Sequence, residues 1–268
     1  MSIGLLIIGD EILSGKRADR HLPKVIDILQ ARGLQLSWAH YLGDEPDRIT
    51  AMLKQTFASG DIVFSCGGIG STPDDHTRQC AADALGVPLV LHPFAKERIT
   101  ERIARISEAA GIPVVMDAPE NRNRMKMGEF PQGAGAIPNS FNGIPGFSVG
   151  THYFVPGFPE MAWTMIEWAL DTYHSHLFHQ TKHIEKSVFI YEAMEATLTP
   201  LMESIEADFP LVKTFSLPKV RTATNRAYVE LGVKGGIDET ERAFARVLWW
   251  LAQQKVEYSL DSPEKERA

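Results

Sequence analysis

The chain has 268 residues, of which 44% are hydrophobic and 23% charged, and 27 basic against 34 acidic residues give a net charge of −7. This composition predicts a globular chain with a real core, forming one large domain or two modest ones. The acidic balance argues against a dedicated surface for nucleic acid or for an anionic membrane. The first ten residues lack a basic segment and their apolar run is short, so we expect neither a signal peptide nor a membrane span. Cys66 and Cys80 are the only cysteines, which indicates no disulfide framework and makes a reducing cytoplasm the expected location.

Strands and helices are expected to alternate in the N-terminal part. Residues 3–8 form an apolar run that is typical of a parallel strand buried on both faces. A helix is predicted at about 19–32, a strand at 34–42, a helix after the cap residue Asp44, a strand at 61–65 and a helix at about 76–85. This order predicts a mostly parallel sheet with helices on both faces.

The segment 67–77, GGIGSTPDDHT, lies where the third predicted strand passes into a helix. Its glycines let the backbone turn tightly and bring bare N–H groups close to an anion, and its hydroxyl side chains can donate as well. Loops of this kind at strand-to-helix junctions bind phosphate. The segment is neither a Walker A loop nor the GxGxxG fingerprint. The candidate ligand-binding residues in it are Gly67, Gly68, Gly70, Ser71, Thr72 and Thr77.

Acidic residues follow two of the predicted strands. Asp74 and Asp75 would repel a phosphate unless a divalent cation such as Mg²⁺ bridged them, although Asp75 as a simple helix cap is the alternative. The loop 9–15 brings Asp10, Glu11 and Ser14 just past the first strand. Because ligands bind at the carboxyl ends of parallel strands, we expect both loops to face one crevice. The candidate metal ligands are Asp10, Glu11, Asp74 and Asp75, and Ser14 is a further ligand-binding candidate.

The middle of the chain contains a short basic segment and a third junction between a strand and a helix. A long helix is predicted up to Gly111, followed by a shorter one at 119–127 whose cations either reach ligand phosphates or form a solvated face. These cations are Arg122, Arg124 and Lys126. Residues 133–145 are predicted to be loop, and 146–155 a hairpin with a turn at 150–151. The segment PGFPEM at 156–161 then leads into a helix, so Gly157 is expected to face the same crevice.

The C-terminal part is predicted to be a separate module. Four histidines lie within 174–183, which we interpret as a solvent-facing linker or, less simply, as a metal site. The domain limits are 1–173 for the α/β domain, 174–184 for the linker, 185–260 for a small two-layer α+β module and 261–268 for a frayed tail. The histidines are His174, His176, His179 and His183.

Together, the segments 9–15, 67–77 and 156–161 resemble the molybdopterin-binding domain of MoaB/Mog type, in the form found in the N-terminal region of CinA proteins. The resemblance runs from Ile3 to about Tyr173, and residues 185–260 are similar in element order to the small middle domain of CinA. It implies a three-layer α/β/α fold, often in a homo-oligomer, whose glycine loop holds the phosphate of a pterin or nucleotide. It also implies that Asp10 and Asp75 are the catalytic and metal-binding acids.

The resemblance implies two related activities. Mog-type members prepare molybdopterin for molybdenum, and the similar domain of CinA-type members hydrolyses the pyrophosphate of ADP-ribose. We therefore expect a phosphorylated pterin or nucleotide as ligand and Mg²⁺-dependent pyrophosphate cleavage. The alternatives are a non-catalytic binding module and a molybdenum cofactor biosynthesis enzyme. Asp75→Asn is expected to abolish turnover and leave the fold intact, since Asn also caps helices well.

Three departures from the family pattern stand out. Ser71 lies where the family usually has Pro, and His21 lies where CinA proteins carry an Asn-containing motif. The sequence ends at Ala268 without the amidohydrolase domain of CinA. From this last difference we expect no deamidation of nicotinamide mononucleotide.

Overall fold

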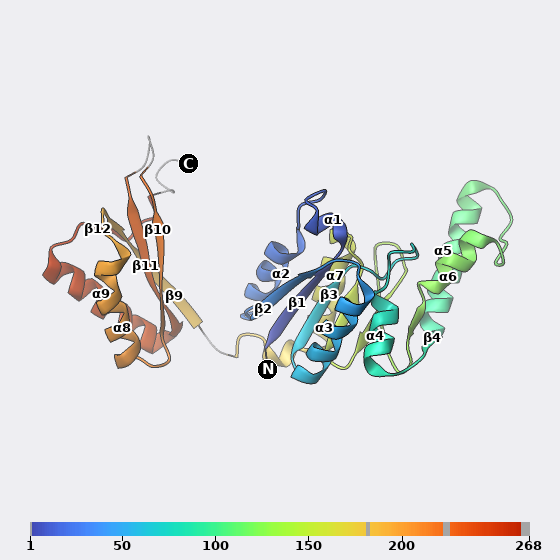
Figure 1. The fold of residues 1–268 in the computed structure, drawn as a ribbon, viewed down its shortest axis with the longest axis horizontal. Helices are drawn as coiled ribbons and strands as arrows, with labels where there is room; N and C mark the ends of the chain where they lie inside the picture. The colour runs from blue at the N-terminus through green and yellow to red at the C-terminus, as the bar shows by residue number, and fades with distance from the viewer. Residues whose placement is uncertain (1, 181–182, 222–225, 264–268) are drawn as a thin grey trace. The chain divides into compact units, whose positions relative to one another are not determined.

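The computed structural model describes residues 2–180, 183–221 and 226–263, and the chain divides into two units, Met1–Phe178 and His179–Ala268 (Figure 1). The first unit extends into the expected linker 174–184 through a 3-10 turn, η1 (Ser175–Leu177). His174 is only 5% exposed, and its Nε2 lies 2.8 Å from the hydroxyl of Tyr153. This histidine is therefore a packed residue of the first unit and not part of a solvated linker. The side chain of His183 lies outside the described residues.

A six-stranded sheet forms the centre of the first unit, with the order β2-β1-β3-β8-β7-β6. The first three pairings between neighbours are parallel and the last two are antiparallel, so only β7 runs against the other strands, which confirms the prediction of a mostly parallel sheet. Every residue of β1 and β3 is buried, because both strands are covered by helices on both faces. The strands are β1 (Ile3–Ile8), β2 (Trp38–Leu42), β3 (Ile62–Cys66), β6 (Gly135–Ile137), β7 (Gly146–Val149) and β8 (His152–Val155).

Helices cover the two faces of this sheet and so complete a three-layer α/β/α fold (Figure 1). On one face, α2 (His21–Gln30) and α7 (Pro159–Tyr173) bury apolar side chains such as Leu29 and Ile166. On the other face, α3 (Pro46–Ser59) and α4 (Thr77–Leu85) bury Leu53 and Ala81 among others. Apolar residues at helical spacing give each helix one buried stripe.

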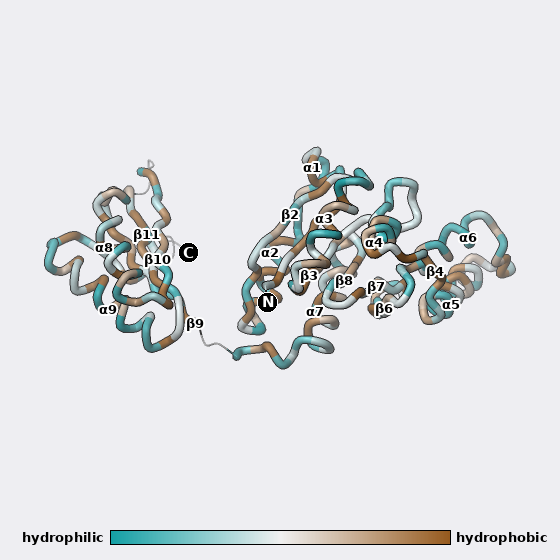
Figure 2. Tube along the Cα trace, turned by 60° about the horizontal axis from the view of Figure 1, so that its bottom comes forward, coloured by the Kyte–Doolittle hydropathy of each residue, from teal (hydrophilic) through white to brown (hydrophobic). Residues whose placement is uncertain are grey.

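An arm of two helices and a small antiparallel sheet follows α4 (Figure 1). It contains β4 (Leu89–Leu91), α5 (Pro93–Ala110), α6 (Pro119–Lys126) and β5 (Glu129–Pro131). Figure 2 shows α6 as a hydrophilic element, in keeping with its exposed charged residues. The prediction of loop throughout 133–145 is wrong, because β6 lies within it and pairs with β7. Strands of three residues are too short to show a periodic pattern.

Two local predictions near the N-terminus are also corrected. The loop after β1 contains a one-turn helix, α1 (Asp10–Leu13). Asp44 does not cap α3, because that helix starts at Pro46 after Glu45 and no side chain caps it. The carboxylate of Asp44 instead accepts a hydrogen bond from the amide of Asp10 at the start of α1.

The second unit is a four-stranded antiparallel sheet with the order β10-β11-β9-β12 and two helices packed on one face. This arrangement confirms the predicted two-layer α+β module. The strand β11 runs through Gly235 and Gly236 directly to the start of α9. Within the described ranges, no helix combines the length and the apolarity needed to cross a bilayer. The elements are β9 (His183–Tyr191), α8 (Glu195–Asp208), β10 (Lys213–Lys219), β11 (Tyr228–Gly236), α9 (Ile237–Gln254) and β12 (Tyr258–Ser259).

Candidate functional site

A crevice of about 700 Å³ lies at the carboxyl ends of β1, β3 and β8. These strands are parallel neighbours in the sheet, so the segments that follow them meet at one edge. The structure thus brings together the three segments singled out in the sequence. The expected site residues that line the crevice are Glu11, Gly67, Gly68, Gly70, Ser71, Thr72, Asp74, Asp75 and Gly157. Asp10 and Ser14 line a second cavity of about 600 Å³ that shares Glu11, Asp44 and Asp74 with the crevice.

The glycines of the loop are required by close backbone packing. Gly67 has a φ of 109° and Gly68 a φ of 68°, which residues with a Cβ rarely adopt. A Cβ on Gly67 would overlap the carbonyl oxygen of Ile8, and one on Gly68 would overlap the hydroxyl of Thr77. A Cβ on Gly157 would lie 3.5 Å from the Cα of Gly67. The loop after β3 is therefore held tightly against β1, α4 and the segment after β8.

Asp75 organises the glycine loop from within. Its Oδ1 accepts a hydrogen bond from the amide of Gly70 (2.9 Å), and its Oδ2 accepts one from the amide of Thr72 (2.8 Å) and one from the Thr72 hydroxyl. The alternative that Asp75 caps α4 is wrong, because the cap residue is His76 and no side chain caps that helix. Asp75 is thus a brace of the loop.

The loop retains free donors after this bracing. Gly67 donates its amide to the carbonyl of Val155, and Gly70 and Thr72 donate theirs to Asp75. Among the described residues, none accepts a hydrogen bond from the amides of Gly68, Ile69 and Ser71. All three residues line the crevice. Consecutive free amides in a tight glycine loop form an anion-binding concavity.

Thr77 does not have the ligand-facing position expected from the sequence. Its side chain is fully buried, its hydroxyl donates to the carbonyl of Gly67 (3.1 Å) and its amide donates to the carbonyl of Gly68 (2.9 Å). It lines neither of the two cavities. Thr77 therefore fixes the start of α4 to the glycine loop and offers no hydroxyl to a ligand.

Arg78 is a buried cation behind the same loop, and no motif in the sequence pointed to it. The residue is 3% exposed, its Nη2 donates to the carbonyl of Gly70 (2.6 Å) and its Nη1 donates to the carbonyl of Lys126. Burial lowers the pKa of its guanidinium, while the carboxylates of Asp75 and Glu129 act in the opposite direction. Arginine is rarely buried, so a sequence pattern places it on the surface.

The cations of α6 do not line the crevice. Arg124 donates to the side chain of Asn121, and neither Arg122 nor Lys126 reaches the cavity. Two other basic residues, Lys16 and Arg17, line it instead, from the loop after α1. Of the two alternatives for the cations of α6, contact with ligand phosphates therefore has no support from the lining of the crevice, whose cations come from the first loop.

A cluster of carboxylates lies beside the glycine loop, and Asp44 is the member that sequence reasoning missed. The pKa of Asp44 is raised by burial and, in addition, by the negative charges of Asp10, Glu11 and Asp74. Carboxylate oxygens are suitable ligands for Mg²⁺. In the part of the chain that the structure describes, however, no three His, Cys, Asp or Glu side chains are arranged to hold a metal ion.

His21 positions the third segment of the crevice. Its Nε2 lies 3.1 Å from the carbonyl oxygen of Gly157, and burial lowers the pKa of its ring. The carboxylate of Asp19 fixes the start of α2 by accepting hydrogen bonds from the amides of His21 (2.7 Å) and Leu22 (3.1 Å). The residue at the place of the family's Asn-containing motif thus ties α2 to the loop after β8.

Comparison with known proteins places these features in context. A family profile described as "Probable molybdopterin binding domain" matches residues 4–176. A CinA-like protein of Anaeromyxobacter sp. (strain K) is 35% identical over 175 residues, which cover 63% of this chain and 40% of that protein. A protein of Pyrococcus furiosus is 30% identical over 221 residues, 80% of this chain and 84% of that protein.

The fold has a counterpart among solved structures. The crystal structure of the protein CinA from Thermoplasma acidophilum matches with a TM-score of 0.50 at 24% identity, over 63% of this chain and 95% of that chain. At this level of identity the likeness concerns the fold. The chain also spans only 40% of the length of the Anaeromyxobacter relative, so the matched segment is one part of that protein.

Proposed function

This chain belongs to the family of probable molybdopterin-binding domains, and on that premise we propose that its crevice binds a phosphorylated pterin or nucleotide. The observation that supports the proposal most directly is the glycine loop. Three of its residues, Gly68, Ile69 and Ser71, line the crevice with amides that have no acceptor among the described residues. A phosphate group supplies such acceptors.

Charge and apolar surface both suit this class of ligand. Lys16 and Arg17 line the crevice, and the buried guanidinium of Arg78 lies behind Gly70. These cations favour a phosphate at the loop. Met127 and Phe158, the latter 57% exposed, line the same crevice and offer apolar surface to a planar ring.

The most concrete activity is hydrolysis of a pyrophosphate, such as that of ADP-ribose. Water attacks one phosphorus, the bridging P–O bond breaks, and the products are AMP and ribose 5-phosphate. A bound divalent cation would neutralise phosphate charge in this reaction. We assign Asp10 to that cation, because no described residue donates a hydrogen bond to its Oδ2. Asp75 acts through the loop that it braces.

A binding role without turnover is the second candidate, either as a carrier module or in molybdenum cofactor assembly. It is favoured by the engagement of Asp75 with Gly70 and Thr72, and by the absence of a ready-made metal cluster among the described residues. Both candidates use the same crevice. Following the family, we further propose that copies of the chain associate, which light scattering of the purified protein would measure.

The test is to incubate the chain with ADP-ribose, with Mg²⁺ or with EDTA, and to follow AMP by chromatography. We expect Mg²⁺-dependent AMP formation that falls at least ~100-fold in Asp10→Asn. Asp27→Asn, an exposed change on α2, is the matched control and should keep full turnover.

Binding is measured in parallel by equilibrium dialysis of ADP-ribose and of molybdopterin. Binding of either ligand without AMP formation under any divalent metal would support the non-catalytic role. If neither ligand binds, the proposed function is wrong.

A further inference from the structure

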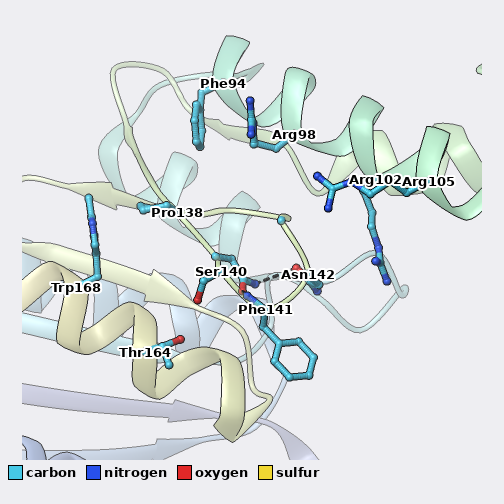
Figure 3. A pocket seen from close by; sticks show the side chains of 12 residues that line it. Phe94, Arg98, Arg102, Arg105, Pro138, Ser140, Phe141, Asn142, Thr164 and Trp168 are labelled. Atoms are coloured by element: carbon cyan, nitrogen blue, oxygen red, sulfur yellow. Dashed lines mark hydrogen bonds between the residues drawn. The ribbon is translucent and has the colours of Figure 1, made fainter.

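A third cavity, of about 430 Å³, lies between α5, the loop 138–143 and α7 (Figure 3). It shares no lining residue with the crevice at the strand ends. Its volume lies within the range of about 300–1,000 Å³ that is typical of small-molecule sites. The proposed function makes no use of it.

One wall of this cavity is formed by three arginines of α5. Arg98, Arg102 and Arg105 are spaced by four and three residues, so they lie on one face of the helix. Ile99 and Ile103 of the same helix are buried. None of the twelve lining residues is acidic. The lining thus carries three cations, although the net charge of the chain is −7.

The three arginines differ in how far they are already paired. Arg98 is held by Glu97 and Glu101, both at 3.1 Å, and by the ring of Phe94, whose centroid is 5.5 Å away. Figure 3 shows Phe94 and Arg98 side by side on α5. The Nε of Arg98 is nevertheless buried without a hydrogen-bond partner among the described residues.

Arg102 and Arg105 have donors to spare. Arg105 lies 3.6 Å from Glu101, and its side chain is 67% exposed. No carboxylate of the described residues pairs with Arg102. Guanidinium groups bind phosphate oxygens with two parallel hydrogen bonds, so this pair suits an anionic group of that shape.

The other walls supply aromatic rings. Phe94, Phe141 and Trp168 all line the cavity, and Phe141 is 66% exposed. The loop that presents Phe141 is held in place by Asn139, whose Oδ1 accepts the amide of Phe141 (3.0 Å) and whose Nδ2 donates to Asn142 (3.0 Å). An exposed ring on a loop that is fixed in this way can stack with another ring.

From this juxtaposition of cations and rings, we propose that the cavity binds a phosphorylated ligand with a planar aromatic ring, such as a nucleoside monophosphate. Arg102 and Arg105 bind the phosphate, and the aromatic side chains contact the ring. The site is separate from the crevice and does not depend on the proposed function of the crevice.

The experiment is a calorimetric titration of the full chain with AMP. Separate titrations with adenosine and with inorganic phosphate probe the ring and the phosphate of AMP, and we expect AMP to bind more tightly than either. The double variant Arg102→Met, Arg105→Met should weaken AMP binding at this site at least ~10-fold, because it removes both guanidinium groups that bind the phosphate. Phe141→Ala should weaken it as well, through a different wall of the cavity.

Two controls separate this site from general charge and from the crevice. Lys96→Met removes an exposed cation of α5 that does not line the cavity, and it should leave AMP binding unchanged. Lys16→Met with Arg17→Met alters the crevice and the cavity beside it but no residue that lines this site, so AMP binding here should persist even if the crevice binds nothing.

Several results would overturn the proposal. These are absence of AMP binding to the wild type, unchanged binding in the double arginine variant, equal loss in Lys96→Met, or phosphate binding as tightly as AMP. An oligomer that binds no AMP and dissociates in the double variant would show instead that this face is an interface between copies of the chain.

Discussion

The amide of Asp10 donates a hydrogen bond to the carboxylate of Asp44 (3.0 Å), and the amide of Asp44 donates one back to the carboxylate of Asp10 (3.2 Å). This reciprocal pair joins the residue after β1 to a residue shortly after β2. It also fixes two carboxylates beside the same cavity. Burial and the charges of Asp10, Glu11 and Asp74 raise the pKa of Asp44, so its ionised form is disfavoured in the folded chain.

Asp44→Asn is therefore expected to stabilise the protein at pH 7 when no divalent cation is present. When folding raises the pKa of an Asp, the folded chain loses stability as pH rises from the unfolded pKa through the folded pKa. Asn removes the negative charge and keeps an oxygen that accepts hydrogen bonds. We expect a rise in Tm of about 1–2 °C, corresponding to about 0.5 kcal/mol after solvent screening. Thermal unfolding at pH 7 measures this change.

The matched control is Asp47→Asn, an exposed acid in the first turn of α3, which should not raise Tm. Added Mg²⁺ should stabilise the wild type more than Asp44→Asn, because a cation relieves the same repulsion. Equal Tm values for the wild type and Asp44→Asn would show that repulsion among these carboxylates does not destabilise the folded chain.

Asp75→Asn is expected to unfold the glycine loop, contrary to the expectation from the sequence. An amide side chain has one acceptor oxygen, so it cannot accept the amides of Gly70 and Thr72 on two oxygens as Asp75 does. We expect a loss of about 1–3 kcal/mol in the free energy of unfolding and weakened phosphate binding. Urea unfolding measures the first quantity.

Its neighbour provides the control, since Asp74 is exposed and Asp74→Asn should change stability by less than about 0.5 kcal/mol. Equal stability of the two variants would show that Asp75 does not brace the loop.

Gly68→Ala should destabilise the chain more than Gly86→Ala does. The two glycines have nearly the same φ, 68° and 69°, so a Cβ strains both backbones by about 1 kcal/mol. Only at Gly68 does the new Cβ overlap a neighbour, the hydroxyl of Thr77, whereas nothing lies within 4 Å at Gly86. The difference should be about 1–3 kcal/mol in urea unfolding, together with loss of ligand binding for Gly68→Ala alone. Identical losses would mean that the loop tolerates the side chain.

The stability of the first unit should fall below pH 6.5 because of His152. This residue is 2% exposed, its ring packs on Phe57, and burial lowers its pKa to about 4 against a smaller opposing effect of Asp61. When folding lowers the pKa of a His, its contribution to the stability of the fold is complete at pH values above the unfolded pKa. That contribution is lost as pH falls towards the folded pKa. Between pH 6.5 and 4 this amounts to roughly 3 kcal/mol.

His152→Phe should remove this part of the pH dependence, which urea unfolding at pH 7 and pH 4.5 would reveal. His40→Phe, at an exposed position, should retain the wild-type dependence. A pH profile of His152→Phe parallel to that of the wild type would contradict the assignment.

Much of the first unit could be predicted because its pattern is local. The apolar run of β1 has no polar face, which only a strand buried on both sides explains. The alternation of such strands with amphipathic helices predicts parallel strands. In a parallel sheet the loops after β1 and β3 lie at the same edge. The short strands β4, β5 and β6 escaped prediction because three residues carry no period.

The sequence by itself determined which segments form the crevice, since glycines and carboxylates directly after buried strands have few other uses. Only the tertiary structure decided what each side chain does there. Asp75 and Thr77 both turned towards the loop backbone, and Arg78 became buried behind it. The physical reason is that buried backbone groups must find partners, and which side chain satisfies them depends on packing between elements that are distant in sequence.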